Sequence, residues 1–295
     1  MDSDIPKQYY PTIKQSFGLI LKLIWTTILL GIPFGIISMI LEAYNLDEKY
    51  INNIGYLILY VILFIILTKS GLGQIKKTGQ PNYHLKFNKI TFKTLLISLL
   101  ILFSGTFMAD PLENLIPMPD AFQDYMLKFI QPNILSFLQI VVAAPILEEL
   151  FFRGIILEGF LKNYSPKKAI IWSAVIFGLA HLNPWQAIGA ILIGILIGWI
   201  YWKTKSLLPG IFIHFTNNLL VFTLTFTTDS NIDSFYELFN NWMVYGIVFL
   251  IALGIFIGGI YLLKKDLNST YPDSEITDDG QTLLTQEAFL HSPTE

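Results

Sequence analysis

Residues 242–263 read WMVYGIVFLIALGIFIGGIYLL, a run without a single charged side chain. A helix needs about 20 mostly apolar residues to cross the hydrocarbon core of a bilayer. The run therefore predicts a membrane-spanning helix. Outward from it, the chain holds seven further apolar runs, at residues 17–41, 54–68, 94–109, 134–160, 169–182, 185–202 and 207–226.

The composition agrees with a membrane protein. Of the 295 residues, 53% are hydrophobic and 14% are charged, whereas soluble domains carry about 25% charged residues. This balance excludes an ordinary soluble enzyme, a nucleic-acid binder with a basic surface and a disordered scaffold. The chain has no cysteine, which excludes a disulfide framework and a thiol nucleophile.

The apolar runs favour helices over a membrane barrel, because they are continuous and do not alternate in segments of about ten residues. A helix also satisfies its own backbone groups inside a bilayer. We expect an all-α, polytopic helix bundle of about eight transmembrane helices. Its expected parts are an N-terminal segment at 1–16, first helices and loops at 17–130, a core at 131–226, a last loop and helix at 227–265, and a flexible acidic tail at 266–295.

The positive charges predict the orientation. Placing the N-terminus in the cytoplasm assigns every lysine and arginine to cytoplasmic segments except Lys49 and Lys128. Positive residues are retained on the cytoplasmic side of membranes. We therefore predict a multi-pass protein of the cell membrane with both termini in the cytoplasm.

Ionisable residues at membrane depth cost on the order of 3 kcal/mol or more each, so they mark candidate functional sites. Residues 141–153 read VVAAPILEELFFR, which embeds Glu148 and Glu149 in an apolar run and ends at Arg153, the only arginine of the chain. Glu149 and Arg153 are spaced i, i+4 and are expected to pair on one helix face. Glu148 points about 100° away, and a carboxylate left free in such a place suits proton transfer.

Two of the four histidines also lie in apolar runs. His181 ends the run at 169–182, and Phe177 shares its helix face. His214 lies in the run at 207–226, where Asn218 follows one turn later. At i, i+4, His214 and Asn218 can both donate hydrogen bonds to one point. We expect Glu148, His181 and His214 to meet in one cavity that opens to the cytoplasm.

Together these residues resemble the CAAX prenyl protease and bacteriocin-processing (CPBP) family of intramembrane endopeptidases. The resemblance covers about residues 134–226 and rests on three motifs in order: Glu148-Glu149-x-x-x-Arg153, Phe177-x-x-x-His181 and His214-x-x-x-Asn218. It implies an all-α bundle with the active site inside it. It also implies a substrate that is a membrane-associated protein or peptide, such as a prenylated CAAX-type one.

The resemblance further implies a role for each motif residue. Glu148 would be the catalytic carboxylate that activates water, and His181 would help to hold that water. His214 and Asn218 would donate hydrogen bonds to the oxyanion on the scissile carbonyl. Three further residues would support the site, namely Glu149, Arg153 and Phe177.

The involvement of a metal is left open by the sequence. A catalytic zinc site, such as that of a metalloendopeptidase, can be formed by two histidines and one glutamate. Here these ligands would be Glu148, His181 and His214. The chain has no His-Glu-x-x-His helix, and a zinc-bound Glu148 would leave only Glu149 as a base. We favour a glutamate mechanism that requires no cofactor, with Zn²⁺ as the alternative.

Two other functions also fit this sequence. Intramembrane Glu, His and Asn residues are typical of proton paths, so a proton-coupled transporter is one alternative, although we find no internal repeat. The other is a non-catalytic member of the same fold that acts as a scaffold or in bacteriocin self-immunity. The lipid bilayer is an expected partner in every case, and no nucleic acid is expected.

Overall fold

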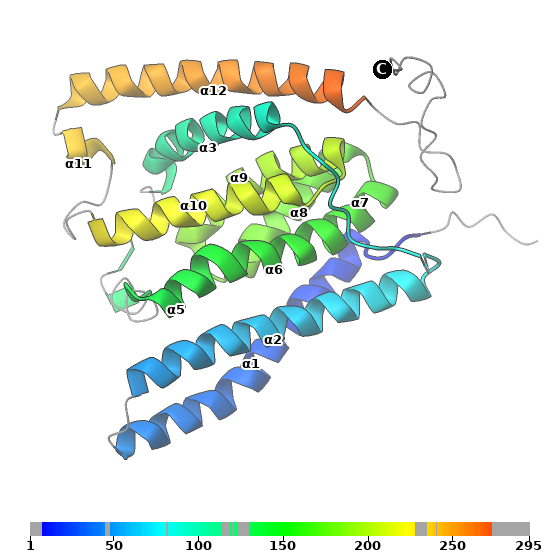
Figure 1. Ribbon diagram of the computed structural model, residues 1–295, viewed down its shortest axis with the longest axis vertical. Helices are drawn as coiled ribbons and strands as arrows, with labels where there is room; N and C mark the ends of the chain where they lie inside the picture. Colours follow the sequence, from blue (N-terminus) through cyan, green and yellow to red (C-terminus); the bar gives the residue numbers. More distant parts are fainter. Residues whose placement is uncertain are drawn as a thin grey trace, which may run out of the picture.

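The structure, a computed structural model, describes residues 8–44, 48–80, 82–113, 118–119, 121–122, 130–227, 235–239 and 241–272. Within these residues all regular secondary structure is helical (Figure 1), which confirms the predicted all-α class. The helices are α1 (Ile13–Ala43), α2 (Glu48–Lys77), α3 (Phe92–Glu113), α5 (Ile134–Phe137), η1 (Leu138–Ala143), α6 (Ala144–Phe151), η2 (Phe152–Leu157), α7 (Glu158–Asn163), α8 (Pro166–Ala180), α9 (Pro184–Thr204), α10 (Leu208–Thr227), α11 (Phe235–Phe239) and α12 (Trp242–Thr270).

Six of the described helices are long and apolar enough to cross a membrane, namely α1, α2, α3, α9, α10 and α12. The apolar run at 134–160 forms an uninterrupted helical stretch from α5 to α7. The run at 169–182 forms α8, which has only 15 residues. The total of eight spans and the cytoplasmic position of both termini stay predictions.

Two π-helical segments, η1 and η2, flank α6 within this stretch. Pro145 lies at the start of α6 and has no N–H to donate to the preceding turn. Just before it, the Ala144 N–H donates to the carbonyl of Gln139, five residues back, as in a π turn. Such wide turns often accompany functional sites, and here they enclose the short helix that carries Glu148 and Glu149.

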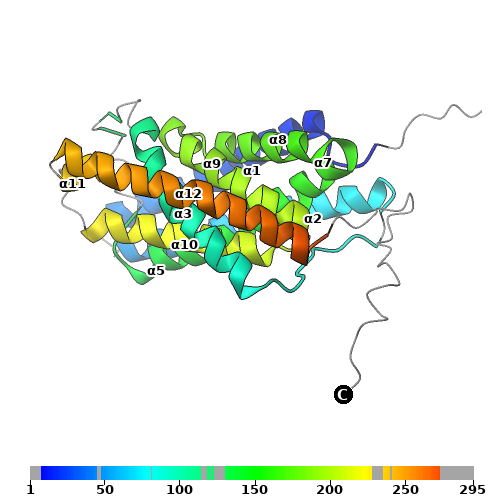
Figure 2. The same cartoon turned by 90° about the horizontal axis from the view of Figure 1, so that it is seen from above.

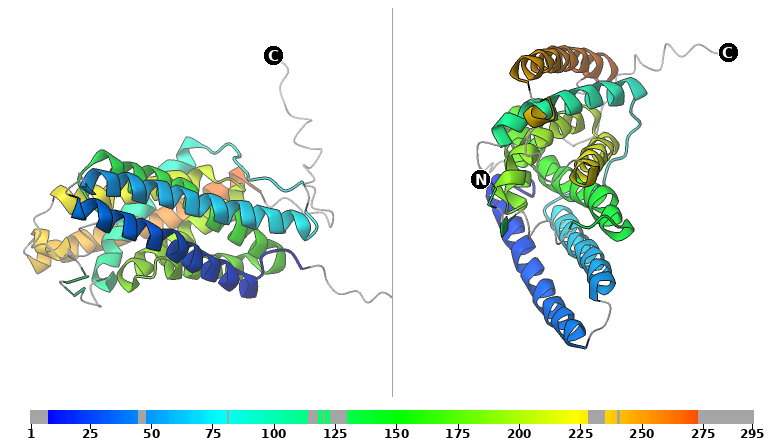
Figure 3. Two further views of the ribbon diagram at one scale, coloured as in Figure 1. Left: turned by 90° about the horizontal axis from the view of Figure 1, so that it is seen from below. Right: turned by 90° about the vertical axis from the view of Figure 1, so that its left-hand side faces the viewer.

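The helix α6 lies at the centre of the bundle, where it contacts α2 and α10 (Figure 1). α8 and α9 pack closely at Gly194. A Cβ added to this glycine would lie only 3.1 Å from the Ala174 side chain. α12 lies over α3, as Figure 2 shows. α1 and α2 form a hairpin on the other side of the bundle (Figure 3), so that α1 reaches α8 while α2 reaches α6.

The ends of the chain differ in part from the predicted boundaries. α1 begins at Ile13, where a capping box between Thr12 and Gln15 starts the helix four residues before the expected position. α12 continues to Thr270, so the expected tail boundary at 266 falls inside this helix. Asp266 is buried there and pairs with Lys93 at 2.9 Å. The remainder of the expected tail, residues 273–295, and Lys128 lie outside the described residues.

Candidate active site

The four residues expected to act in catalysis line one cavity of about 720 Å³. Glu148 comes from α6, His181 follows the last residue of α8, and His214 and Asn218 lie on α10. Three separate helical segments therefore bring these side chains together. Phe177 and Tyr60 line the same cavity.

The most deeply buried part of the site is the pair of Glu149 and Arg153. Arg153 Nη1 donates to Glu149 Oε1 at 2.7 Å, as their spacing predicts, and the two side chains are 1% and 0% exposed. Arg153 Nη2 donates to the carbonyl of Gly194 at 3.4 Å. The guanidinium lies 4.4 Å from the centre of the Phe177 ring, a cation–π contact. The planar group therefore ties α6 to both α8 and α9.

His214 joins this pair through its ring nitrogen Nδ1, which lies 3.1 Å from Glu149 Oε1. A carboxylate only accepts hydrogen bonds, so Nδ1 carries the proton in this contact. The other nitrogen, Nε2, faces Glu148 Oε2 at 4.0 Å. Phe177 packs edge-on against this imidazole at 5.6 Å. Glu149 thus fixes the orientation of His214 toward Glu148.

Glu148 has a partner that the sequence analysis missed. The hydroxyl of Tyr60, on α2, donates a hydrogen bond to Glu148 Oε1. Glu148 Oε2 is buried and has no hydrogen-bond partner among the described residues. The two oxygens of this carboxylate are therefore different: one is held by a tyrosine, and the other faces His214.

His181 has its ring nitrogen Nδ1 2.9 Å from the carbonyl of Phe177. A carbonyl oxygen only accepts, so Nδ1 carries a proton and Nε2 of the neutral ring is an acceptor. The ring packs edge-on against Phe177 at 5.0 Å. The chain turns directly after His181, where Leu182 has a φ of 53° and Asn183 caps α9.

Among the residues that the structure describes, Asn218 makes no hydrogen bond to the other motif residues. Its amide nitrogen donates to the carbonyl of Ile140 in η1 at 2.9 Å, and its oxygen accepts from Asn217 at 3.4 Å. An amide nitrogen carries two hydrogens, of which this contact uses one. The bond to η1 holds the Asn218 amide at the cavity wall.

A glycine on α10 makes room for the buried pair. A Cβ at Gly210 would lie 2.9 Å from Glu149 Oε2. Real Cβ atoms are almost never found this close to a neighbour that cannot move, and Glu149 is held by both Arg153 and His214. Gly210 is therefore a second residue of the site that the motifs did not indicate.

The cavity extends from the polar groups toward one end of the bundle. On α10 its lining runs from His214 to Thr225, and on the 134–163 stretch it stops at Glu148. Its far end is lined by Leu112, Ile130 and Trp185. These residues lie at the helix ends that are opposite the lysine-rich ends. The charge count predicts that the lysine-rich ends are cytoplasmic and that the opposite ends are not. The cytoplasmic opening of the cavity and the sidedness of the chain both stay predictions.

The ligand set expected for zinc is not assembled in this arrangement. Across the described residues, no three His, Asp or Glu side chains lie in a group that would hold one metal ion. Glu148, His181 and His214 line the same cavity, but their positions do not fit a shared metal centre. We therefore derive no step through a metal.

A comparison with known proteins found a family match over the part of the chain that contains these residues. Residues 130–220 match the Type II CAAX prenyl endopeptidase Rce1-like family. No curated protein and no solved structure matches the chain. The match contains all three motifs and confirms the resemblance to the CPBP intramembrane proteases for this part of the chain. Tyr60 lies outside the matched residues.

Proposed function

We propose, from the Rce1-like domain at residues 130–220 and the site that it carries, that this membrane protein is an intramembrane endopeptidase that hydrolyses a peptide bond with a water activated by Glu148. The observation that carries the proposal is the unequal bonding of the Glu148 carboxylate. Oε1 accepts from Tyr60, while Oε2 is buried without a described partner. A buried acceptor of this kind requires an explanation, and a bound water supplies one.

The geometry around Oε2 supports this role. It lies 4.0 Å from His214 Nε2, and one water at ordinary hydrogen-bond distances of about 2.8 Å can contact two atoms so spaced. Glu148 would remove a proton from this water as its oxygen attacks the scissile carbonyl. The same carboxyl group would then give the proton to the leaving amine. His181, with Nε2 as an acceptor, would help to orient the water.

His214 and Asn218 would stabilise the oxyanion. Glu148, Glu149 and Arg153 together carry a formal charge of −1, so a proton on His214 makes the four-residue group neutral. Protonated His214 has an Nε2–H to donate, and Asn218 has a second amide hydrogen beside the one given to Ile140. Removing one donor of such an oxyanion site typically costs about 10²–10³ in rate. Glu149, Arg153 and Phe177 would act by positioning His214.

We propose that the reaction requires no metal ion. The base, the oxyanion donors and the proton source are all side chains of the site. A stoichiometric metal that is lost together with activity on chelation, and that restores activity when it is added back, would contradict this part of the proposal.

The cavity also supports a class of substrate. Most of its lining residues are apolar, among them Ile101, Leu102, Leu196 and Phe256, while Glu148 and His214 lie at its inner end. Such a cavity fits an apolar or lipid-modified segment with one peptide bond at the polar end. We propose a membrane-associated protein or peptide as substrate, with a prenylated CAAX-type peptide as the first to test.

The test compares the wild-type protein with Glu148→Gln in defined vesicles. Farnesylated and unmodified peptides of the same sequence are incubated in H₂¹⁸O and analysed by mass spectrometry. We expect the wild type to produce one new C-terminus that contains ¹⁸O, and Glu148→Gln to lose about 10³-fold or more of the rate. Glu42→Gln, a change at an exposed glutamate of α1, should retain the wild-type rate. Equal cleavage by wild type and Glu148→Gln would contradict the proposal.

A further inference from the structure

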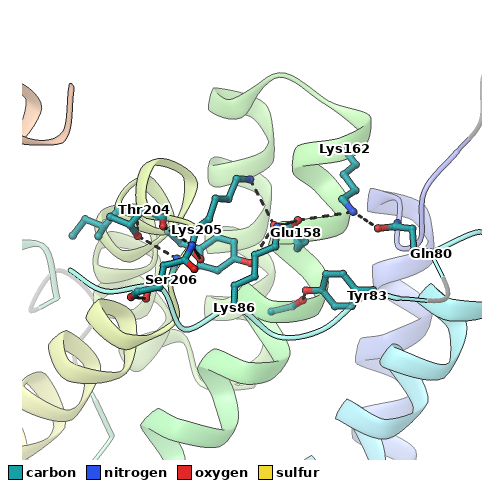
Figure 4. Close-up of polar contacts among 12 residues, drawn as sticks. Gln80, Tyr83, Lys86, Glu158, Lys162, Thr204, Lys205 and Ser206 are labelled. Carbon is teal, nitrogen blue, oxygen red and sulfur yellow. Dashed lines mark hydrogen bonds and ion pairs between the residues drawn. The ribbon is translucent and has the colours of Figure 1, made fainter. Parts of the chain in front are cut away.

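A second group of charged residues lies at the lysine-rich end of the bundle, around Glu158 (Figure 4). The Glu158 side chain is only 4% exposed. Lys86 Nζ donates to its Oε1 at 2.9 Å, Lys205 Nζ lies 3.6 Å from Oε2, and Lys162 Nζ lies 3.9 Å from Oε1. We call these four residues the Glu158 cluster. It lies ten residues beyond Glu148 and does not line the catalytic cavity.

The three lysines come from three segments. Lys162 donates a hydrogen bond to Gln80, and the segments of Lys86 and Lys205 are fixed against each other. The Leu207 N–H donates to the carbonyl of Lys86, and Ser206 Oγ donates to the carbonyl of Asn88. Asn88 in turn donates to the carbonyl of Lys205, which ends α9 with a left-handed φ of 48°. The loop before α3 is therefore docked on the turn after α9, so that the cluster is already assembled without a ligand.

The positive charge in the cluster exceeds what Glu158 requires. Three ammonium groups and one carboxylate leave a formal charge of +2. Asp266 shows the contrast, because Lys93 is the one cation that pairs with this buried carboxylate among the described residues, and Thr94 donates a hydrogen bond to it. Glu158 already accepts from Lys86 and from the Tyr201 hydroxyl at 3.1 Å. Two further lysines beside it therefore leave a surplus that one anion would balance.

The lysines are also in the right environment to bind an anion. Their side chains are 31%, 30% and 29% exposed, so they are partly removed from water but still reachable. Burial lowers the pKa of Lys162 and of Lys205; Glu158 opposes the shift, while the charge of Lys86 adds to it. An anion between these ammonium groups would relieve their mutual repulsion.

We propose that the Glu158 cluster binds the phosphate of an anionic phospholipid head group. The cluster lies near the C-terminal ends of α7 and α9. In a membrane protein, the ends of the helices lie at the level of the lipid head groups. Basic pockets between helices at this level bind phosphate head groups, at about 1 kcal/mol for each lysine. A lipid is favoured over a soluble anion because its chains lie beside the apolar helix faces while its phosphate reaches the lysines.

The test uses the full chain, purified in a neutral detergent. Its thermal unfolding is measured during titration with dioctanoyl phosphatidylglycerol, with dioctanoyl phosphatidylcholine and with inorganic phosphate, all at one ionic strength. We expect phosphatidylglycerol to raise the unfolding temperature in a saturable way and phosphatidylcholine to have no such effect. An equal shift with inorganic phosphate at the same concentration would overturn the head-group assignment.

Two variants and a control separate binding from folding. Lys162→Gln removes the lysine farthest from Glu158 and should weaken phosphatidylglycerol binding about fivefold. Glu158→Gln raises the formal charge of the cluster to +3 and should strengthen binding, although it removes a buried interaction. Lys264→Gln changes an exposed lysine near the C-terminal end of α12. This variant should bind phosphatidylglycerol like the wild type. Unchanged binding by Lys162→Gln, or weaker binding by Glu158→Gln, would overturn the proposal. If Glu158→Gln does not fold, Lys162→Gln alone decides.

Discussion

The same helical stretch carries two buried acidic centres that compensate their charge in opposite ways. At Glu148 and Glu149, one guanidinium and one imidazole serve two carboxylates. At Glu158, three lysines serve one carboxylate. Fully buried side chains separate the two centres, including Phe151, Phe152 and Ile155. The first centre therefore carries a formal charge of −1 unless His214 holds a second proton, whereas the second carries a formal charge of +2.

The unsatisfied polar atoms show the same difference. Glu148 Oε2, Glu149 Oε2 and Arg153 Nε are buried without a hydrogen-bond partner among the described residues, whereas both oxygens of Glu158 accept hydrogen bonds. Unsatisfied buried groups cost free energy, typically about 1–3 kcal/mol each. In the proposed reaction, the unbonded Glu148 oxygen of the first centre would accept a water, whereas both carboxylate oxygens of the second centre are already bonded.

The two centres should differ most in their response to replacement of a cation. Arg153→Lys removes the fork that reaches both Glu149 and Gly194, so we expect a loss of about 3 kcal/mol in unfolding free energy and a large loss of activity. Lys86→Arg in the second centre should change stability by less than about 0.5 kcal/mol, because the lysine there acts as a partly exposed point charge. Denaturant unfolding of both variants measures this. Equal effects would show that the two centres are not distinct.

A glycine substitution should test how tightly the first centre is packed. Gly210→Ala places a Cβ 2.9 Å from Glu149 Oε2, and we expect overpacking to cost about 2 kcal/mol and to lower activity by displacing His214. Gly246→Ala is the matched control, since no atom lies within 4 Å of its added Cβ. The control should be neutral or stabilising by up to about 1 kcal/mol. A stabilised, fully active Gly210→Ala would contradict the packing that we describe.

The smallest effect is expected from the tyrosine that distinguishes the two oxygens of Glu148. Tyr60→Phe keeps the ring against Phe64 but removes the hydroxyl. We expect kcat to fall about tenfold, which corresponds to about 1.4 kcal/mol, with little change in KM. Tyr56→Phe, one turn away on α2, is the control, and equal kcat values for the two variants would exclude a positioning role for Tyr60.

Interactions within one helix were predictable from the sequence, as was the meeting of Glu148, His181 and His214 in one cavity. The individual contacts between distant segments were not. The spacing of Glu149 and Arg153 predicted their ion pair, and helix geometry placed His214 and Asn218 on one face. Nothing in the sequence linked Tyr60 to Glu148, since they are 88 positions apart, although a hydroxyl in the apolar run at 54–68 was a signal that could have been followed.

The Glu158 cluster was missed for the same reason. The charge count placed Lys86, Lys162 and Lys205 on one side of the membrane, but it contains no information about which carboxylate they surround. The direction in which the cavity extends could not be predicted from the sequence either. The depth of a residue along its helix does not indicate where the packed helices leave a cavity. Both features depend on tertiary packing.

The short length of α8 has a consequence for hydration. Its 15 residues extend for about 22 Å, which is less than the roughly 30 Å of a hydrocarbon layer. If α8 starts at one surface of the bilayer, its end at His181 and the turn at Leu182 lie within the layer. Lipid tails cannot bond to the open backbone of such a turn, so its free groups must be satisfied by neighbouring protein groups, by water that reaches the turn through the protein, or by local thinning of the bilayer. Where water fills this role, the irregular turn would maintain the supply of the second reactant at the place where the peptide bond is to be broken.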